Sequence, residues 1–137
     1  MTTSLPKLTY FDQGGRAESI RIMLAHANFA YNDNRFAAED WPTMQATTPM
    51  GGVPLWEEDG YTMCQTNSIL RQLGIRLGYY PEDPDLAYNA DSLCDFIEDD
   101  CQTAYMYIAV LMETGANDPE IIKNYYKKKM RVVDARL

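Results

Sequence analysis

The chain has 137 residues, of which 46% are apolar, so it can bury a core and is too hydrophobic for a disordered protein. This length suits one globular domain, or one small domain followed by part of a second. Its 12 basic and 20 acidic residues give a net charge of −8, which argues against nucleic acid or an anionic membrane as a partner, because both repel an acidic surface.

The first part of the chain alternates short strands with helices. Alternation in KLTYF predicts a strand over 7–11, and apolar residues spaced three and four apart predict a helix over 16–28. We next expect a polar strand over 31–36, a short irregular helix over 39–47, strands over 53–56 and 61–64, and a helix over 66–77. The last two strands flank EEDG, whose glycine suits the positive φ of a hairpin turn. The order βαβαββα predicts a compact α/β domain over residues 1–80.

After residue 80 the pattern becomes helical, with residues 81–85 as a linker. From Leu86 to Leu111 apolar residues recur at alternating spacings of three and four, which predicts one long amphipathic helix. Asp118 and Pro119 suit the cap and first turn of a second helix. We therefore expect a partial all-helical domain over 86–137. Two helices cannot cover each other's apolar faces completely, so an exposed apolar face should drive dimers or larger assemblies.

Cysteine and histidine usage and hydropathy suggest the environment of the protein. No apolar run approaches a membrane span, and the N-terminus lacks the apolar core of a signal peptide. Cys64, Cys94 and Cys101 have neither CxxC nor zinc-ligand spacing, so we expect reduced thiols in a cytoplasmic protein with no metal site. His26, the only histidine, has no nucleophile at motif spacing, and we expect a structural role for it.

Three features converge at one edge of the predicted α/β domain. Tyr10 ends the first strand beside two glycines, either as ordinary strand filler or as a hydroxyl aimed at a bound molecule. A cis bond between Val53 and Pro54 would leave the Val53 N–H and C=O free to pair with a bound peptide. Gln65 and Thr66 begin a helix whose first N–H groups form an anion site. Together these features predict a pocket for a peptide-like molecule with a carboxylate.

The motifs around these features resemble one known family. They are YFDQGGRAESIRIML, DWPTMQATTPMGGVPLWEEDG, CQTNSILRQLG and ADSLCDFIEDD, in order and at family spacing. The chain is similar along essentially its whole length to the cytosolic glutathione transferases, most closely to the tyrosine-type classes (sigma, pi, mu and alpha). The resemblance implies a thioredoxin-like N-terminal domain followed by a truncated all-helical C-terminal domain. It also implies glutathione as co-substrate, a small electrophile as second substrate, and a homodimer or a larger protein assembly.

The resemblance assigns the catalytic role to Tyr10. Its hydroxyl would donate a hydrogen bond to the sulfur of glutathione and favour the thiolate, which then attacks an electrophilic carbon. A free thiol, with a pKa near 8.5, is only a few per cent ionised at pH 7. Gly14 and Gly15 would form a close-approach turn over the bound sulfur, with Arg16 as a brace.

The glutathione-binding residues also follow from the resemblance. The Val53 backbone, next to Pro54, would pair with the cysteinyl unit, and Asp99 would contact the γ-glutamyl amine in the neighbouring subunit of a dimer. The remaining binding positions are Gln65 and Thr66 for the γ-glutamyl carboxylate, Trp41 for the glycyl end, Gln45 where the family usually has lysine, and Arg16 near the ligand.

Departures from the family pattern leave a second function open. Gln45 weakens capture of the glycyl carboxylate, and the family continues for several helices beyond those present here. Tyr105, Ile108 and Met112 fit either an apolar substrate pocket or interhelical core. A non-catalytic, glutathione-transferase-like subunit of a larger complex is therefore the alternative to a transferase or isomerase. Thiol–disulfide exchange is disfavoured, since no cysteine begins the first helix.

Overall fold

The computed structural model describes residues 4–102, 120, 123–124 and 127 of the chain. The chain divides into two compact units, residues 1–81 and residues 82–137.

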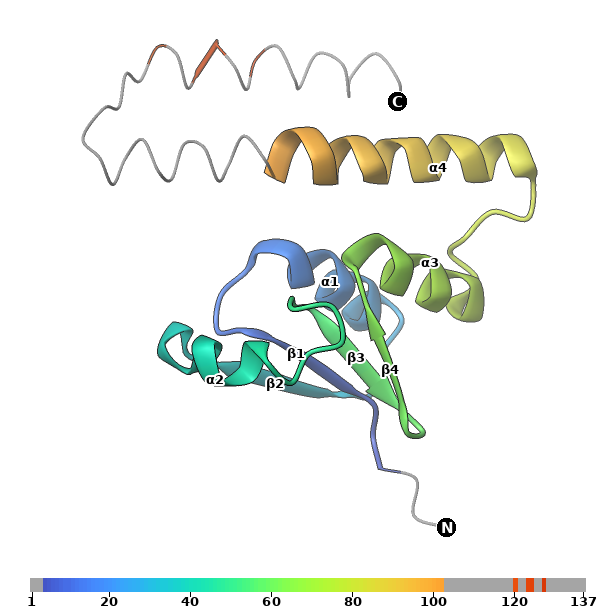
Figure 1. The fold of residues 1–137 in the computed structure, drawn as a ribbon. Coiled ribbons are helices and arrows are strands. Elements are labelled where there is room, and N and C mark those ends of the chain that lie inside the picture. Colours follow the sequence, from blue (N-terminus) through green and yellow to red (C-terminus); the bar gives the residue numbers. More distant parts are fainter. Residues whose placement is uncertain (1–3, 103–119, 121–122, 125–126, 128–137) are drawn as a thin grey trace. The chain divides into compact units, whose positions relative to one another are not determined.

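The described residues of the first unit form four strands and three α-helices (Figure 1). The strands are β1 (Lys7–Phe11), β2 (Asn32–Phe36), β3 (Leu55–Glu58) and β4 (Tyr61–Cys64). The α-helices are α1 (Glu18–His26), α2 (Trp41–Gln45) and α3 (Thr66–Leu77), and 3-10 turns at Gly15–Ala17 and Ala38–Asp40 lead into α1 and α2. This element order confirms the predicted βαβαββα domain.

The strands form one sheet in the order β2-β1-β3-β4. β1 pairs in parallel with β2, and Tyr10 lies opposite Arg35. β1 pairs antiparallel with β3, which pairs antiparallel with β4 through the hairpin. The turn residues Asp59 and Gly60 both have positive φ, at 50° and 79°, as a tight hairpin requires. The arrangement is the thioredoxin-like fold that the family resemblance implied.

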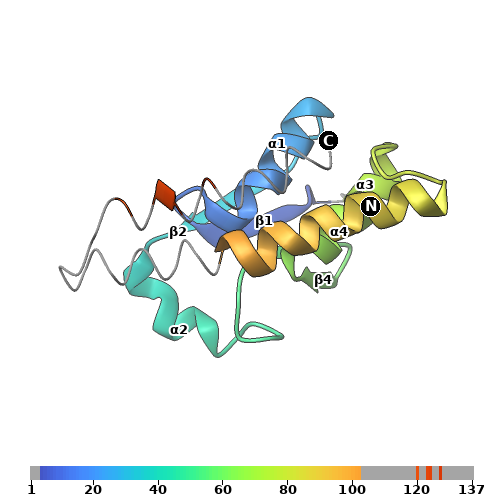
Figure 2. The ribbon, with the colours of Figure 1, turned by 90° about the horizontal axis from the view of Figure 1, so that it is seen from above.

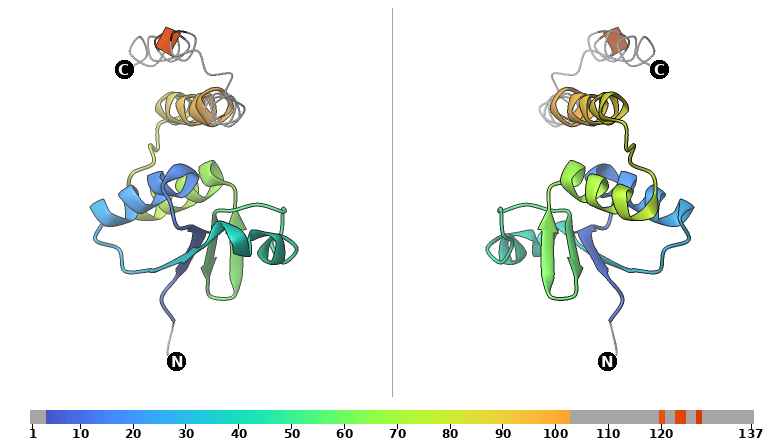
Figure 3. Two further views of the ribbon diagram at one scale, coloured as in Figure 1. Left: turned by 90° about the vertical axis from the view of Figure 1, so that its left-hand side faces the viewer. Right: turned by 90° about the vertical axis from the view of Figure 1, so that its right-hand side faces the viewer.

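The core of this unit lies between the sheet and two helices. α1 and α3 lie next to each other on one face of the sheet (Figures 1 and 3), while α2 lies well away from them (Figures 2 and 3). Apolar side chains from the sheet and from both helices are fully buried together: Leu8, Ile20, Leu24, Trp56, Ile69 and Leu73. Tyr10 belongs to the same cluster, so its ring is anchored by the core.

Several boundaries differ by one to three residues from those predicted for this unit, and two of the differences have a clear physical reason. β3 begins at Leu55 rather than Val53, because Pro54 has no N–H to donate to the ladder. The predicted helix 16–28 starts with the 3-10 turn, and its α-helical part ends at His26. Asn28 then takes a left-handed conformation at φ 49°, which is a common way for a helix to end.

In the second unit, α4 (Pro84–Phe96) begins two residues before the predicted helix. The Asp83 carboxylate accepts hydrogen bonds from the N–H groups of Asp85 and Leu86, both at 3.0 Å, and Pro84 occupies the first turn. A π-helical segment, Ile97–Gln102, replaces the predicted continuous α-helix there. The remainder of that helix, including Tyr105, Ile108 and Met112, and the capping pair Asp118–Pro119 lie outside the described residues. Across the described part of the chain, no helix combines the length and apolarity needed to cross a membrane.

An ion pair joins the β3–β4 hairpin to α3, and its contribution to stability should depend on pH. Arg76 Nη2 donates to Glu58 Oε1 at 2.9 Å, Arg76 Nη1 also bonds Glu58, and the buried Trp56 Nε1 donates to Glu58 Oε2 at 3.0 Å. The hydrogen bonds from Arg76 hold the pKa of the Glu58 carboxyl below its ordinary value of 4.5, against the opposing effect of partial burial. A lowered folded-state pKa stabilises the fold above the unfolded-state pKa, and this stabilisation is lost as pH falls through the folded-state value.

We therefore expect Glu58→Gln to reduce the free energy of unfolding at pH 7 by less than about 1 kcal/mol, because solvent screens a partly exposed pair. The amide oxygen of the introduced glutamine would still accept from Trp56, so the substitution isolates the charge. Urea denaturation at pH 7 and at pH 3 measures the effect, with the exposed Glu39→Gln as control. A stability difference that persists at pH 3 would contradict the ion-pair origin.

Candidate active site

Tyr10 lies near the C-terminal end of β1, with its ring buried and its hydroxyl against the loop that follows the strand. The residue is 6% exposed, and its ring packs edge-on against Phe11 at 5.4 Å. The backbone N–H of Arg16 donates to Tyr10 Oη at 3.2 Å. No acceptor for the phenolic proton is recorded within the described part of the chain. The hydroxyl is therefore held as an acceptor by the loop while its own proton remains available to a bound group.

The loop after β1 approaches this hydroxyl very closely at Gly15. Gly15 has φ +81°, and a Cβ built on it would lie 3.0 Å from Tyr10 Oη. Glycine is required here for both the left-handed backbone and the close approach. The structure brings Gly15 against Tyr10, and the placement of this turn over a bound sulfur stays a prediction.

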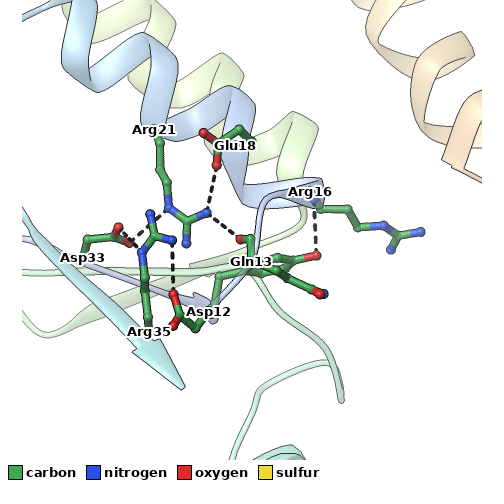
Figure 4. A network of polar contacts seen from close by, with 8 residues as sticks. Asp12, Gln13, Arg16, Glu18, Arg21, Asp33 and Arg35 are labelled. Carbon is green, nitrogen blue, oxygen red and sulfur yellow. Dashed lines mark hydrogen bonds and ion pairs between the residues drawn. The ribbon is translucent and has the colours of Figure 1, made fainter. Parts of the chain in front are cut away.

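Arg16 contacts Tyr10 through its backbone. The backbone N–H of Arg16 is hydrogen-bonded to the Tyr10 hydroxyl, whereas the Arg16 side chain points away from the loop (Figure 4). Arg16 therefore meets Tyr10 through its main chain, and its bracing role near the ligand stays a prediction.

The second part of the candidate site is the segment before β3. The Val53–Pro54 peptide bond is cis, as expected from the sequence. Val53 is partly buried against the core, and Pro54 is buried. Within the described residues, no hydrogen bond is recorded for the Val53 N–H or C=O, so both groups are available to pair with a bound peptide.

The third part is the start of α3. Gln65, at the cap position, has φ +75° and makes no side-chain cap hydrogen bond. Its Nε2 lies 3.6 Å from Met50 Sδ, and Thr66 beside it is 8% exposed. A non-glycine residue with positive φ costs on the order of 1–3 kcal/mol and is concentrated at functional sites. A helix start without a cap from the Gln65 side chain suits an anionic ligand.

α2 supplies Trp41 and Gln45. The Trp41 ring packs on Phe11 at 5.4 Å and stacks on Phe36 at 6.1 Å. Gln45 Nε2 donates to the carbonyl of Gly51 at 3.2 Å, which ties α2 to the loop that leads into Val53. Asp99 belongs to the second unit, where it lies on the segment Ile97–Gln102.

The structure adds Arg21, which the sequence interpretation did not select. Arg21 is 6% exposed on α1, and its guanidinium carbon lies 5.9 Å from the centroid of the Tyr10 ring. The sequence contains a signal for its burial. Arg21 lies four residues after Ala17, one after Ile20 and three before Leu24, and these three positions are buried. An arginine on the apolar stripe of a short helix indicates a buried charge with specific partners.

The family model for the glutathione S-transferase N-terminal domain matches residues 6–74, which is half of the chain. The chain belongs to the glutathione S-transferase family. The matched segment spans β1 to α3 and therefore contains every candidate site residue except Asp99. The assignment to the tyrosine-type classes is compatible with this match and stays a prediction.

Individual transferases and synthases show the same relationship. The chain is 39% identical over 93 residues to glutathione S-transferase 1 of Ascaris suum, covering 68% of this chain and 45% of that protein. It is 40% identical over 93 residues to hematopoietic prostaglandin D synthase of Gallus gallus, covering 68% and 47%. The solved glutathione S-transferase of Ascaris lumbricoides superimposes with a TM-score of 0.82 at 30% identity, covering 96% of this chain and 66% of that structure. The chain thus spans less than half the length of these two curated relatives.

Proposed function

We propose that this protein binds glutathione and stabilises its thiolate for attack on a small electrophile, or for an isomerisation that needs glutathione. The observation that carries the proposal is the Tyr10 hydroxyl, which accepts from the Arg16 N–H at 3.2 Å and leaves its proton for a sulfur. Lowering the pKa of a thiol by roughly two units makes the thiolate dominant at pH 7, at about 1.4 kcal/mol per unit. The thiolate then forms the new carbon–sulfur bond as the leaving group departs with its electron pair.

The rest of the first unit would hold glutathione around that sulfur. We assign the cysteinyl unit to the free backbone groups of Val53, beside the cis bond to Pro54, since two main-chain hydrogen bonds pair naturally with a peptide. Gln65 and Thr66 would bind the γ-glutamyl carboxylate at the uncapped start of α3.

The glycyl end of glutathione would lie towards α2. There Trp41 offers an aromatic wall, and Gln45 offers an amide in place of a cation. Arg16 would act through its backbone at Tyr10, and Asp99 would serve the neighbouring subunit's site in a homodimer. These roles, the small electrophile as second substrate and a cytoplasmic location are parts of the same proposal.

Retention on immobilised glutathione, measured together with turnover of an aryl halide, tests the proposal. Retention with turnover supports a transferase. Retention without turnover indicates a glutathione-binding protein whose second-substrate chemistry differs, and an assay of prostaglandin isomerisation is then the next measurement, because relatives include prostaglandin D synthases. If the protein is not retained and shows no turnover, the proposal is overturned, and the non-catalytic assembly subunit is favoured.

A further inference from the structure

The buried guanidinium of Arg21 connects three segments of the first unit. Its Nε donates to Asp33 Oδ1 on β2 at 3.2 Å, and its Nη1 donates to Glu18 Oε2 on α1 at 3.0 Å. The same Nη1 donates to the Gln13 carbonyl, in the loop after β1, at 2.9 Å. Figure 4 shows Arg21 between Asp33 on one side and Glu18 and Gln13 on the other.

Neutralisation of the Arg21 charge does not by itself explain the position of its guanidinium. Two carboxylates, Glu18 and Asp33, already compensate the buried charge, and Asp33 also accepts from Arg35 Nε at 2.7 Å. Yet Arg21 Nη2 is buried with no hydrogen-bond partner among the described residues. A buried donor without a partner destabilises the fold, and more so when the group is charged. The guanidinium is thus held in a position from which Nη1 reaches the Gln13 carbonyl, although Nη2 is left without a hydrogen bond.

The contact with Gln13 acts on the part of the loop that reaches Tyr10. The beginning of the loop is fixed by backbone hydrogen bonds, from Asp12 N–H to Phe36 O at 2.9 Å and from Gln13 N–H to Phe11 O at 2.7 Å. Two glycines follow, and the next residue, Arg16, donates its N–H to Tyr10 Oη. Glycine has little conformational preference of its own, so the loop depends on anchors on both sides of this pair. The Gln13 carbonyl, which accepts from Arg21, holds the loop before the two glycines, and the Gly15 carbonyl accepts from the Glu18 N–H at the start of α1.

Arg21 also lies over the ring of Tyr10, whose hydroxyl accepts the hydrogen bond from the Arg16 N–H. Its guanidinium carbon lies 5.9 Å from the centroid of the Tyr10 ring, within the range of a cation–π interaction. One side chain therefore contacts both the loop that presents the Arg16 N–H and the ring that carries the accepting oxygen.

We propose that Arg21 is a positioning residue that fixes the hydrogen bond between the Arg16 N–H and the Tyr10 hydroxyl, and so orients the Tyr10 proton towards the bound thiol. Its consequence for thiolate formation rests on the proposed function, whereas its effect on the loop does not. Arg21 touches no reacting atom in this scheme. The exposed Arg35 also bonds Asp33, and its Nη1 donates to Asp12 at 3.3 Å. Among the described residues, its side chain makes no contact with Gln13 or Tyr10, and Arg35 meets Tyr10 through the pairing of β1 with β2.

The experiment compares Arg21→Met and Arg21→Lys with Arg35→Met in the full chain. Arg35→Met is the matched control, because it also removes an arginine from Asp33 but leaves the contacts with Gln13 and Tyr10 in place. The first readout is amide hydrogen exchange of Arg16 in the protein without ligand, measured by NMR. The second is the pH midpoint for ionisation of the bound glutathione thiol, followed by ultraviolet absorbance of the thiolate.

Both Arg21 variants should speed exchange of the Arg16 amide by at least about tenfold relative to Arg35→Met, because its hydrogen bond opens more often. Arg21→Met should also raise the ionisation midpoint of the bound thiol by about one pH unit or more, since the Tyr10 donor is less well oriented. Arg21→Lys, which keeps the charge but loses the planar fork, should lie between Arg21→Met and the unaltered protein.

The outcomes separate this proposal from the proposed function. Arg16 exchange in Arg21→Lys equal to that in Arg35→Met overturns the positioning role, and this comparison decides it even if Arg21→Met fails to fold. If the unaltered protein does not bind glutathione, the proposed function falls, while the exchange measurement still decides what Arg21 does to the loop. If the Arg21 variants exchange the Arg16 amide faster but leave the ionisation midpoint of the bound thiol unchanged, Arg21 positions the loop without affecting thiolate formation.

Discussion

Tyr10→Phe is expected to lower turnover at pH 7 by about 25-fold, because the bound thiol returns from a pKa roughly two units below normal to about 8.5 and its ionised fraction falls accordingly. The deficit should shrink above about pH 9, where the thiol ionises without help. Affinity for glutathione should weaken by less than about fivefold in the pH range where the thiol is protonated, since only the preference for the thiolate form is lost. Phenylalanine keeps the buried ring, so the fold should lose only the hydrogen bond to the Arg16 N–H, worth about 1 kcal/mol.

Rate measurements across pH 6 to 10 check this expectation, together with calorimetric titration of glutathione at the acidic end of that range. Tyr61→Phe is the control, because Tyr61 lies on β4 with 69% of its surface exposed and belongs to no part of the candidate site. Full activity of Tyr10→Phe at pH 7 would rule out the role assigned to Tyr10. A deficit that persists undiminished at high pH would point to a different use of the hydroxyl.

Gly15→Ala is expected to impair both stability and turnover. An L-residue at φ +81° costs about 1–2 kcal/mol. In addition, its Cβ would lie 3.0 Å from Tyr10 Oη, so the hydroxyl or the loop must give way. Displacement of the thiol donor should lower kcat/KM by at least about tenfold, because small geometric errors are costly in a preorganised site.

Gly60→Ala separates the two effects. Gly60 has φ +79° in the β3–β4 hairpin, but a Cβ built there would meet nothing within 4 Å. Both variants should therefore lose a similar backbone contribution to the free energy of unfolding in urea, and only Gly15→Ala should lose kcat/KM. If the two variants had equal kcat/KM, the approach of Gly15 to Tyr10 would have no functional consequence.

Much of the first unit could be predicted because the signals are local. The strand of Tyr10, the hairpin at Asp59–Gly60 and the helix that starts at Thr66 follow from alternation, turn chemistry and helix periodicity. The π-helical segment from Ile97 could not be predicted in this way, since its apolar spacing also fits a regular α-helix.

The sequence by itself determined the order of elements, the family and the set of residues from which a glutathione site would be built, because these depend on short-range patterns and on motifs at fixed spacing. Only the tertiary structure decided which atoms of that set meet. It showed that Gly15 closes on the Tyr10 hydroxyl, that Arg16 contacts Tyr10 by its backbone, and that Arg21 is buried among Glu18, Asp33 and Gln13. The physical reason is that these contacts form when β2 and α1 pack beside β1, and no local propensity records how closely separate segments approach.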